Sequence, residues 1–231
     1  MQPLRWLVFV LALAAALRAA EPNTLTPAEH ADGWKLLFDG RSLAGWRSLG
    51  SEAPPAGWQV AAGALTLPAK GGGGDLVSAE AFGDFELSVE WKVAAATNSG
   101  IIYRVGLDEK RTYLTGPEYQ ILDNVQGEDN HPPSHTAAAL YDLVAPPQDY
   151  TRPVGEWNEA RIRVRGWHVE HWLNGHLVVD VDLASPAGQA LIAGSKFKTW
   201  PKFGSLLRGH IALQDHGHAV AFRSLKLREL K

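Results

Sequence analysis

Strict alternation of apolar and polar side chains is the feature that most constrains the fold of this chain. In residues 84–93, DFELSVEWKV, every second side chain is apolar, and those between are mostly charged. In an extended strand, such a sequence places the apolar set on one face and the polar set on the other. This is typical of an antiparallel strand with one face in a core and the other in solvent.

The same signal recurs along the chain, with Gly and Pro between the repeats. Alternating segments occupy residues 99–105, 117–124 and 159–166, and residues 209–230 predict two strands joined across residues 213–217. Asn174-Gly175 separates two β-rich segments and predicts a hairpin turn, since both residues tolerate positive φ. Residues 185–197 predict a helix, with Ser185 as N-cap and Pro186 at the first helical position. We therefore expect an all-β fold, a two-sheet antiparallel β-sandwich of jelly-roll type with one short helix.

The first twenty residues have the layout of a secretory signal peptide. Arg5 precedes an apolar run over residues 6–17, which small residues follow. The run is short for a membrane span, so no span is expected. We predict a signal peptide over residues 1–20, a linker over 21–32, one sandwich domain over 33–231, and export to the periplasm or medium.

Charge and cysteine usage exclude several classes of function. The formal net charge is −3, and loss of Arg5 and Arg18 with the signal peptide gives −3 − 2 = −5. Nucleic acid is thus not an expected partner, since phosphate binding relies on a basic surface. The sequence contains no cysteine, which excludes disulfides, thiol catalysis and thiolate metal sites.

Glu118 and Asp123 are the acidic pair that most resembles a glycosidase dyad. They are five residues apart, so a regular strand places them on opposite faces, whereas a retaining dyad needs carboxyl groups about 5 Å apart. Glu118 shares its face with Gln120, which cannot ionise. Alternation alone favours the interpretation of Glu118 as a solvated strand residue.

Aromatic and cationic side chains suggest a sugar site near residues 195–204. Lys196 and Trp200 lie in GSKFKTWPKFG, and sugars bind where aromatic faces adjoin directional polar groups. Tryptophan also fills sandwich cores, which is our interpretation for Trp34, Trp91 and Trp157.

The segment LQDHG, residues 213–217, carries three adjacent polar side chains. Strand parity places Gln214 and His216 on one face, and we expect them to face a cleft while Asp215 anchors the turn before Gly217. His216 and His218 have the two-residue spacing of some metal ligands, but this signal alone is weak.

Seven segments together resemble one family, the 3-keto-disaccharide hydrolase domain family. The segments are LFDGRSLAGW, DFELSVEWK, NSGIIYR, PEYQILDN, AALYDL, PVGEWNEARIRVRGWHVEHWLNG and GHIALQDHGHAVAFRSLKLREL. They follow the family's order and cover residues 33 to 230. The resemblance implies a concanavalin-like jelly roll in an exported protein that acts on glycosides whose glucose unit carries a ketone.

The resemblance also implies a chemistry that needs no carboxylate dyad. The ketone acidifies the hydrogen on the carbon next to the anomeric centre, so one base can remove it, the aglycone leaves, and water adds to the enone. Such a site needs a base, a group that stabilises the enolate and an acid for the leaving oxygen.

Matching family positions supply the candidate site residues. His216 is the preferred base because its ordinary pKa, about 6.5, suits proton abstraction near neutrality. Glu118 is the alternative base or the partner that orients it, and Arg104 or a divalent cation would stabilise the enolate. The expected substrate-binding residues are Gln120, Gln214, Tyr141, Asp142, Lys196 and Trp200. The loop containing His135 departs from the family pattern, so metal ligands are not assigned.

Two alternatives remain at this point. A non-catalytic carbohydrate-binding module would use the same fold, since fold does not determine function. A conventional sandwich glycosidase would need Glu118 and Asp123 across one cleft.

Overall fold

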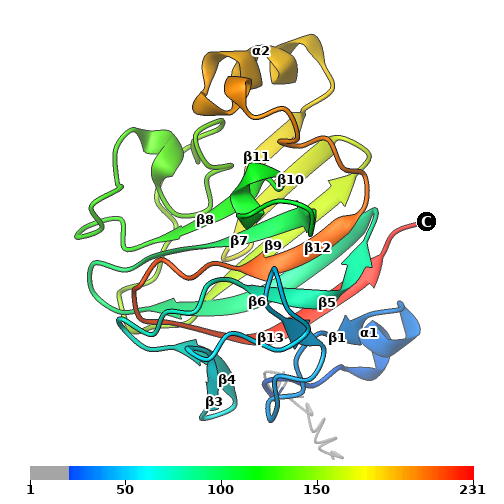
Figure 1. Cartoon of the computed structure of the whole chain (residues 1–231), viewed down its shortest axis with the longest axis vertical. Coiled ribbons are helices and arrows are strands. Elements are labelled where there is room, and N and C mark those ends of the chain that lie inside the picture. Colours follow the sequence, from blue (N-terminus) through cyan, green and yellow to red (C-terminus); the bar gives the residue numbers. More distant parts are fainter. Residues whose placement is uncertain (1–20) are drawn as a thin grey trace, which may run out of the picture.

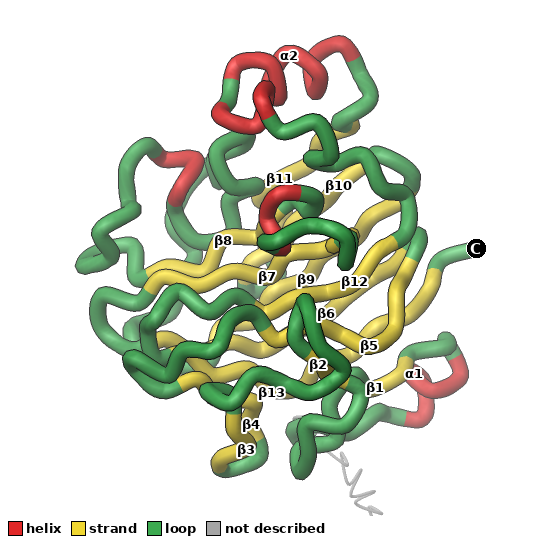
Figure 2. The backbone as a smooth tube through the Cα atoms, in the orientation of Figure 1, coloured by secondary structure: helices red, strands yellow, loops and turns green. Residues whose placement is uncertain are grey.

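The computed structural model describes residues 21–231, which form two antiparallel sheets packed face to face (Figure 1). The predicted signal peptide, residues 1–20, lies outside the described residues. Strands dominate, and the α-helices α1 and α2 lie outside the two sheets (Figure 2). The predicted all-β sandwich is therefore confirmed.

Within residues 21–231, the larger sheet has eight strands in the order β11-β10-β9-β6-β13-β4-β3, with β1 beside β13. Their bounds are β1 (Lys35–Leu36), β3 (Gln59–Ala61), β4 (Ala64–Leu67), β6 (Phe85–Val93), β9 (Asn158–Arg165), β10 (His168–Leu173), β11 (His176–Asp182) and β13 (Val220–Glu229).

The smaller sheet has five strands in the order β2-β5-β12-β7-β8 over the same residues. Their bounds are β2 (Trp46–Arg47), β5 (Leu76–Phe82), β7 (Asn98–Val105), β8 (Glu118–Leu122) and β12 (Gly209–Leu213). Three short 3-10 turns border this sheet or its loops: η1 (Thr112–Leu114), η2 (Pro133–His135) and η3 (Lys196–Thr199).

The core lies between the sheets, where the predicted alternation places it. The apolar set of β6 is buried, as is that of β9. Tyr119 and Ile121 of β8 enter the same cluster from the smaller sheet. Glu118 and Gln120 consequently project from the opposite face of that sheet.

Two local predictions are confirmed and one is incomplete. The turn between β10 and β11 contains Asn174 and Gly175, both with positive φ. Helix α2 (Pro186–Gly194) starts after Ser185, whose side chain accepts a hydrogen bond from the Gly188 amide. The described chain has a second α-helix, α1 (Pro27–Ala31), in the predicted linker.

No helix within the described part of the chain is long and apolar enough to cross a bilayer.

The segment after β12 carries the chain from one sheet to the other. Strand β12 belongs to the smaller sheet and β13 to the larger, so residues 214–219 cross the edge of the sandwich. Gln214 and His216 thus lie where the two sheets are joined, beside the outer face of the smaller sheet.

The core interpretation is right for one of the three tryptophans named above. Trp91 is fully buried. Trp34 and Trp157 are only half-buried, and the guanidinium groups of Arg228 and Arg223 respectively lie over their rings, 5.1 and 4.1 Å from the ring centroids. The apolar faces of these two rings are thus sheltered by cation-π contacts at the surface.

Candidate active site

A pocket of about 340 Å³ opens on the outer face of the smaller sheet. Strand β8 and the end of β12 contribute to it, together with η1, η3 and residues from the 129–141 segment. Its volume is within the usual range for small-molecule sites. The lining residues are Asn98, Tyr113, Glu118, Gln120, Asp129, Tyr141, Lys196, Phe197, Trp200, Gln214 and His216.

Glu118 occupies space that a glycine on the neighbouring strand leaves open. Strands β7 and β8 pair with Gly100 opposite Gln120 and Ile102 opposite Glu118. A Cβ at position 100 would lie 2.1 Å from Oε1 of Glu118. The missing side chain of Gly100 therefore allows the carboxyl group to lie against β7.

The environment of Glu118 favours its protonated form. Burial raises the pKa of this carboxyl to about 8, and the negative charge of Asp75 acts in the same direction, while Lys196 opposes it. Only 8% of the residue is exposed, so the solvated-strand interpretation is wrong. At pH 7 Glu118 is mainly protonated and can donate a proton.

Asp75 is a second, half-buried carboxyl beside the site. It accepts a hydrogen bond from the Asp215 amide at 2.9 Å and another from the Thr112 hydroxyl. Burial raises its pKa above the ordinary value, since desolvation disfavours the charged form.

Gln120 and Gln214 bring unpartnered amide atoms to the pocket. Gln120 is 1% exposed, yet neither its Oε1 nor its Nε2 has a hydrogen-bond partner, and Oε1 of Gln214 also has none. A buried polar atom without a partner costs about 1–3 kcal/mol. A ligand with both donors and acceptors, such as a sugar, would satisfy these atoms.

A hydrogen-bonded chain of side chains supports another wall of the pocket, to which Tyr141 and Asp129 contribute. Tyr141 donates to Asp129 at 2.8 Å, and His135 bridges Asp129 at 2.8 Å and Asp142 at 3.0 Å. Asp142 also accepts from the Lys196 backbone amide at 3.2 Å. The Lys196 ammonium lies 4.2 Å from the centre of the Tyr141 ring.

These contacts correct the prediction for Asp142. Its carboxylate does not line the pocket but lies behind the wall, where it holds His135 and the start of η3. Tyr141 does line the pocket. Burial, with its hydrogen bond to Asp129, raises the pKa of the Tyr141 phenol, so the hydroxyl remains a donor.

His216 lies at the exposed mouth of the pocket. Its ring stacks on His218 with centroids 5.6 Å apart, and Nδ1 of His218 accepts a hydrogen bond from the Asn98 amide. Asp215 accepts from the amides of Gly74 at 3.0 Å and Gly217 at 2.9 Å. The predicted division of LQDHG, with Gln214 and His216 in the cleft and Asp215 anchoring the turn, is confirmed.

Arg104 is not part of this pocket. Its guanidinium donates to Asp84 at 3.0 Å and to the Gly166 carbonyl, at the end of the sandwich where β9 turns into β10. Tyr103 and Arg104 together oppose Ile211 across a β-bulge, and Arg104 has a φ of +54°. The bulge breaks the alternation and turns Arg104 away from the face that Glu118 occupies, so its predicted role at the enolate is not supported.

Asp123 also lies away from the pocket. Its carboxylate accepts hydrogen bonds from the amides of Ala96, Val125 and Gln126, and it lines a separate hollow. Glu118 and Asp123 therefore do not flank one cleft, and the conventional glycosidase dyad is not formed.

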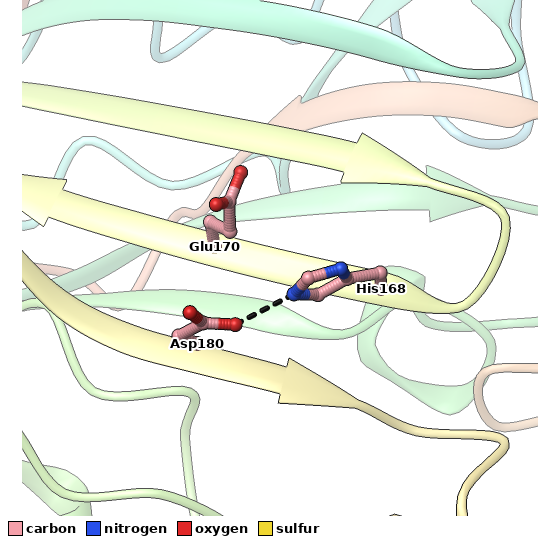
Figure 3. A group of neighbouring side chains, drawn as sticks. All are labelled: His168, Glu170 and Asp180. Carbon is pink, nitrogen blue, oxygen red and sulfur yellow. Dashed lines mark hydrogen bonds and ion pairs between the residues drawn. The ribbon is translucent and has the colours of Figure 1, made fainter.

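One cluster of three potential metal ligands occurs within residues 21–231: His168, Glu170 and Asp180 (Figure 3). It lies on β10 and β11 of the larger sheet, not at the pocket. His168 is bonded to Asp180 at 2.6 Å, and Glu170 forms an ion pair with Arg163 at 3.1 Å. The ligand atoms thus already have protein partners.

Four lining residues were missed by sequence reasoning. Asn98 begins β7, Tyr113 and Phe197 lie in η1 and η3, and Asp129 lies in a loop. At such positions no strand periodicity indicates the orientation of a side chain. The aromatic character of GSKFKTWPKFG was a usable signal for Phe197. Nothing local marks Asp129, because its partners lie up to twelve residues away on a loop.

The chain is similar to known proteins over most of its length. The model of the 3-keto-alpha-glucoside-1,2-lyase-like domain matches residues 33–228. A 3-keto-disaccharide hydrolase of Bacteroides thetaiotaomicron is 35% identical over 249 residues, covering 93% of this chain and 84% of that protein.

Solved structures agree with the fold. A "putative glycosyl hydrolase" from Parabacteroides distasonis superposes with a TM-score of 0.83 at 29% identity, covering 91% of this chain and all of that one. The carbohydrate-binding module CBM66 from Bacillus subtilis shares the fold alone, with a TM-score of 0.51 and 12% identity over 80% of this chain and 96% of the module.

Proposed function

Since the chain belongs to the 3-keto-alpha-glucoside-1,2-lyase-like family, we propose that it cleaves the glycosidic bond of 3-keto-glycosides. The net reaction is hydrolysis, through elimination and then addition of water. The relative named as a 3-keto-disaccharide hydrolase supports this substrate class.

The observation that carries the proposal is that Glu118 and His216 both line one pocket. The two groups have contrasting surroundings, since Glu118 is buried with a pKa raised to about 8, whereas His216 is exposed at the mouth. A protonated carboxyl can serve as the acid and an imidazole as the base of one reaction. A conventional glycosidase would need a second carboxyl in place of the imidazole.

In the first step, His216 removes the proton from C2, between the ketone at C3 and the anomeric carbon. The electron pair of the broken C–H bond moves to the ketone oxygen as an enolate. The Nε2 atom of Gln120 and the ammonium of Lys196 are the donors that would stabilise this charge. Lys196 takes the place that the sequence assigned to Arg104.

In the second step, the enolate re-forms the ketone and a double bond forms between C1 and C2. The C1–O bond breaks, its electron pair goes to the glycosidic oxygen, and Glu118 gives its proton to that oxygen. Water then adds its oxygen to C1 while His216 returns a proton to C2, and Glu118 takes a proton from the water.

We also propose that the protein is exported, on the strength of the apolar N-terminal segment with Arg5 ahead of it. Mass spectrometry of the protein recovered from the periplasm or medium tests this. The expected mass lacks about the first twenty residues, and recovery of the full-length chain from the cytoplasm alone would refute it.

The activity test is incubation with 3-keto-trehalose and with an unoxidised trehalose control, with and without chelator. Release of glucose and 3-keto-glucose is expected only from the oxidised substrate. In D₂O, the 3-keto-glucose should carry deuterium at C2, which direct displacement at C1 would not introduce. The chelator comparison measures whether a divalent cation shares in enolate stabilisation.

Variants at the two proposed catalytic residues should separate their roles. His216→Ala is expected to lower kcat about 10²–10⁴-fold on every 3-keto-glycoside, the usual size of a general-base effect. Glu118→Gln should lower kcat as strongly on 3-keto-trehalose but much less on a 4-nitrophenyl 3-keto-glucoside, because nitrophenolate leaves without protonation.

The matched control is His168→Gln on the outer face of the larger sheet, which should keep full activity. Binding of trehalose with no product from any oxidised glycoside would instead identify a carbohydrate-binding module. Full activity in both His216→Ala and Glu118→Gln would refute the assignment of these residues.

A further inference from the structure

Two aromatic rings form a shelf at one side of the pocket. Tyr113 comes from η1 and Trp200 follows η3, and their ring centroids lie 5.6 Å apart with the planes tilted by 36°. Both residues line the pocket, and Tyr113 is 37% exposed. We call these two rings the aromatic shelf.

The rings under Trp200 hold it in place. Trp200 meets Phe197 edge to face at 5.0 Å, and Phe197 stacks on Phe203 at 3.8 Å. Both phenylalanines are buried. One half of the shelf therefore rests on the core instead of moving freely with its loop.

The loops that carry the two halves are tied to each other. Lys202, two residues after Trp200, forms ion pairs with Asp108 at 2.6 Å and Glu109 at 2.9 Å. The Gly204 amide also donates to the Thr115 carbonyl at 2.8 Å. The shelf is thus built from two segments about ninety residues apart, held together before any ligand binds.

The pocket has a polar interior, and the aromatic shelf lies at one side of its more open part. The unpartnered amide atoms of Gln120 and Gln214 are buried, and they suit a sugar ring with a ketone and hydroxyl groups. The shelf is more exposed and offers ring faces with few polar atoms. Because the leaving group must depart to solvent, it lies on the open side of the bound keto-sugar.

We propose that the aromatic shelf is the subsite for the leaving group. It selects 3-keto-glycosides whose aglycone presents an apolar ring face, such as a second pyranose, over those with a small alkyl aglycone. Stacking on such a face needs no particular hydroxyl pattern. The shelf therefore selects for the ring shape of the aglycone more than for the position of the glycosidic linkage. This inference rests on the proposed function.

The test compares two substrates that share the keto-sugar and differ in the aglycone. Tyr113→Ala is assayed on 3-keto-trehalose and on methyl 3-keto-α-glucoside. We expect kcat/KM on 3-keto-trehalose to fall about tenfold, mainly because KM rises. A loss of this size corresponds to the removal of one ring contact. The value on the methyl glucoside should stay within about twofold of the wild type.

Tyr150→Ala is the matched control, because this tyrosine stacks on His176 at 4.0 Å away from the pocket. This variant should change kcat/KM on neither substrate. Trp200→Leu tests the second half of the shelf, and thermal melting of each variant checks that it is folded.

An equal loss on both substrates, or no loss on 3-keto-trehalose in either folded shelf variant, would overturn the shelf proposal while leaving the proposed function intact. A wild-type protein that cleaves neither substrate would overturn the proposed function, and the shelf proposal with it.

Discussion

At the scale of single residues, Gly100 shows how closely the backbone is fitted to the Glu118 carboxyl. Its neighbour Glu118 fills the position where a side chain would begin. The atoms in conflict are Oε1, Cδ and Cγ of Glu118, all in one side chain, so Gly100→Ala is expected to displace the carboxyl while the sheet remains intact. We predict a loss of kcat of about tenfold or more on 3-keto-trehalose, with only a small fall in Tm.

Gly83→Ala is the control for this substitution, because a Cβ there meets no atom closer than 3.8 Å. It should leave kcat and Tm close to those of the wild type. Normal turnover by Gly100→Ala would mean that the observed position of Glu118 is not the active one.

At the scale of elements, regular strands were predictable and the interruptions were not. The alternation of β6 and β9 correctly indicated which side chains enter the core. Likewise, Ser185 and Asn174 marked the start of α2 and a hairpin, because capping and turn chemistry act over a few residues. The capping box of α1, formed by Thr26 and Glu29, is a local sequence signal of the same kind for the start of a helix.

The bulge in β7 shows why the remainder could not be predicted. Residues 99–105 alternate regularly in sequence, but one extra residue opposite Ile211 reverses the orientation expected for Arg104. That residue is fixed by pairing with β12, about a hundred positions away. Asp129 and Tyr113 escaped prediction for the same reason, since long-range packing orients the loops that carry them.

The corrected position of Arg104 leads to a prediction. Arg104→Met should keep kcat within about twofold, because the guanidinium lies outside the pocket. It should lower stability by about 1–3 kcal/mol, since Asp84 and the Gly166 carbonyl lose a charged donor. Chemical denaturation and steady-state kinetics measure the two effects separately.

Asp84→Asn keeps Arg104 and removes only the opposing charge, so it should show a smaller loss of stability and normal kcat. A folded Arg104→Met variant with a hundredfold lower kcat would restore the role at the enolate that the sequence suggested.

At the scale of the whole molecule, the two sheets have separate tasks. The larger sheet closes the core, while the smaller sheet supports the pocket on its outer face. The crossing segment after β12 brings Gln214 and His216 to that face. Because the crossing is part of the sandwich itself, the positions of these two side chains depend on correct packing of both sheets.

Two buried groups give the fold opposing responses to pH. Glu118 has its pKa raised from 4.5 to about 8 by burial, so the folded state holds a proton that the unfolded state loses between these values. The contribution of Glu118 to the free energy of unfolding is complete below pH 4.5 and falls as the pH rises to about 8. Burial lowers the pKa of His171 from 6.5 to about 4, so its contribution instead rises with pH between about 4 and 6.5.

Between pH 4.5 and 6.5 the changes in unfolding free energy with pH due to Glu118 and His171 nearly cancel. Above pH 6.5, of these two groups, only Glu118 still contributes a change. We therefore predict that the wild-type free energy of unfolding falls by roughly 2 kcal/mol between pH 6.5 and 8. Glu118→Gln removes this group, so its stability should rise to pH 6.5 and then stay level or fall only slightly, since Asp75 has its pKa raised in the same direction. Denaturant titrations of both proteins across pH 5 to 8.5 measure the difference, and parallel curves would show that Glu118 is ionised in the folded protein at neutral pH.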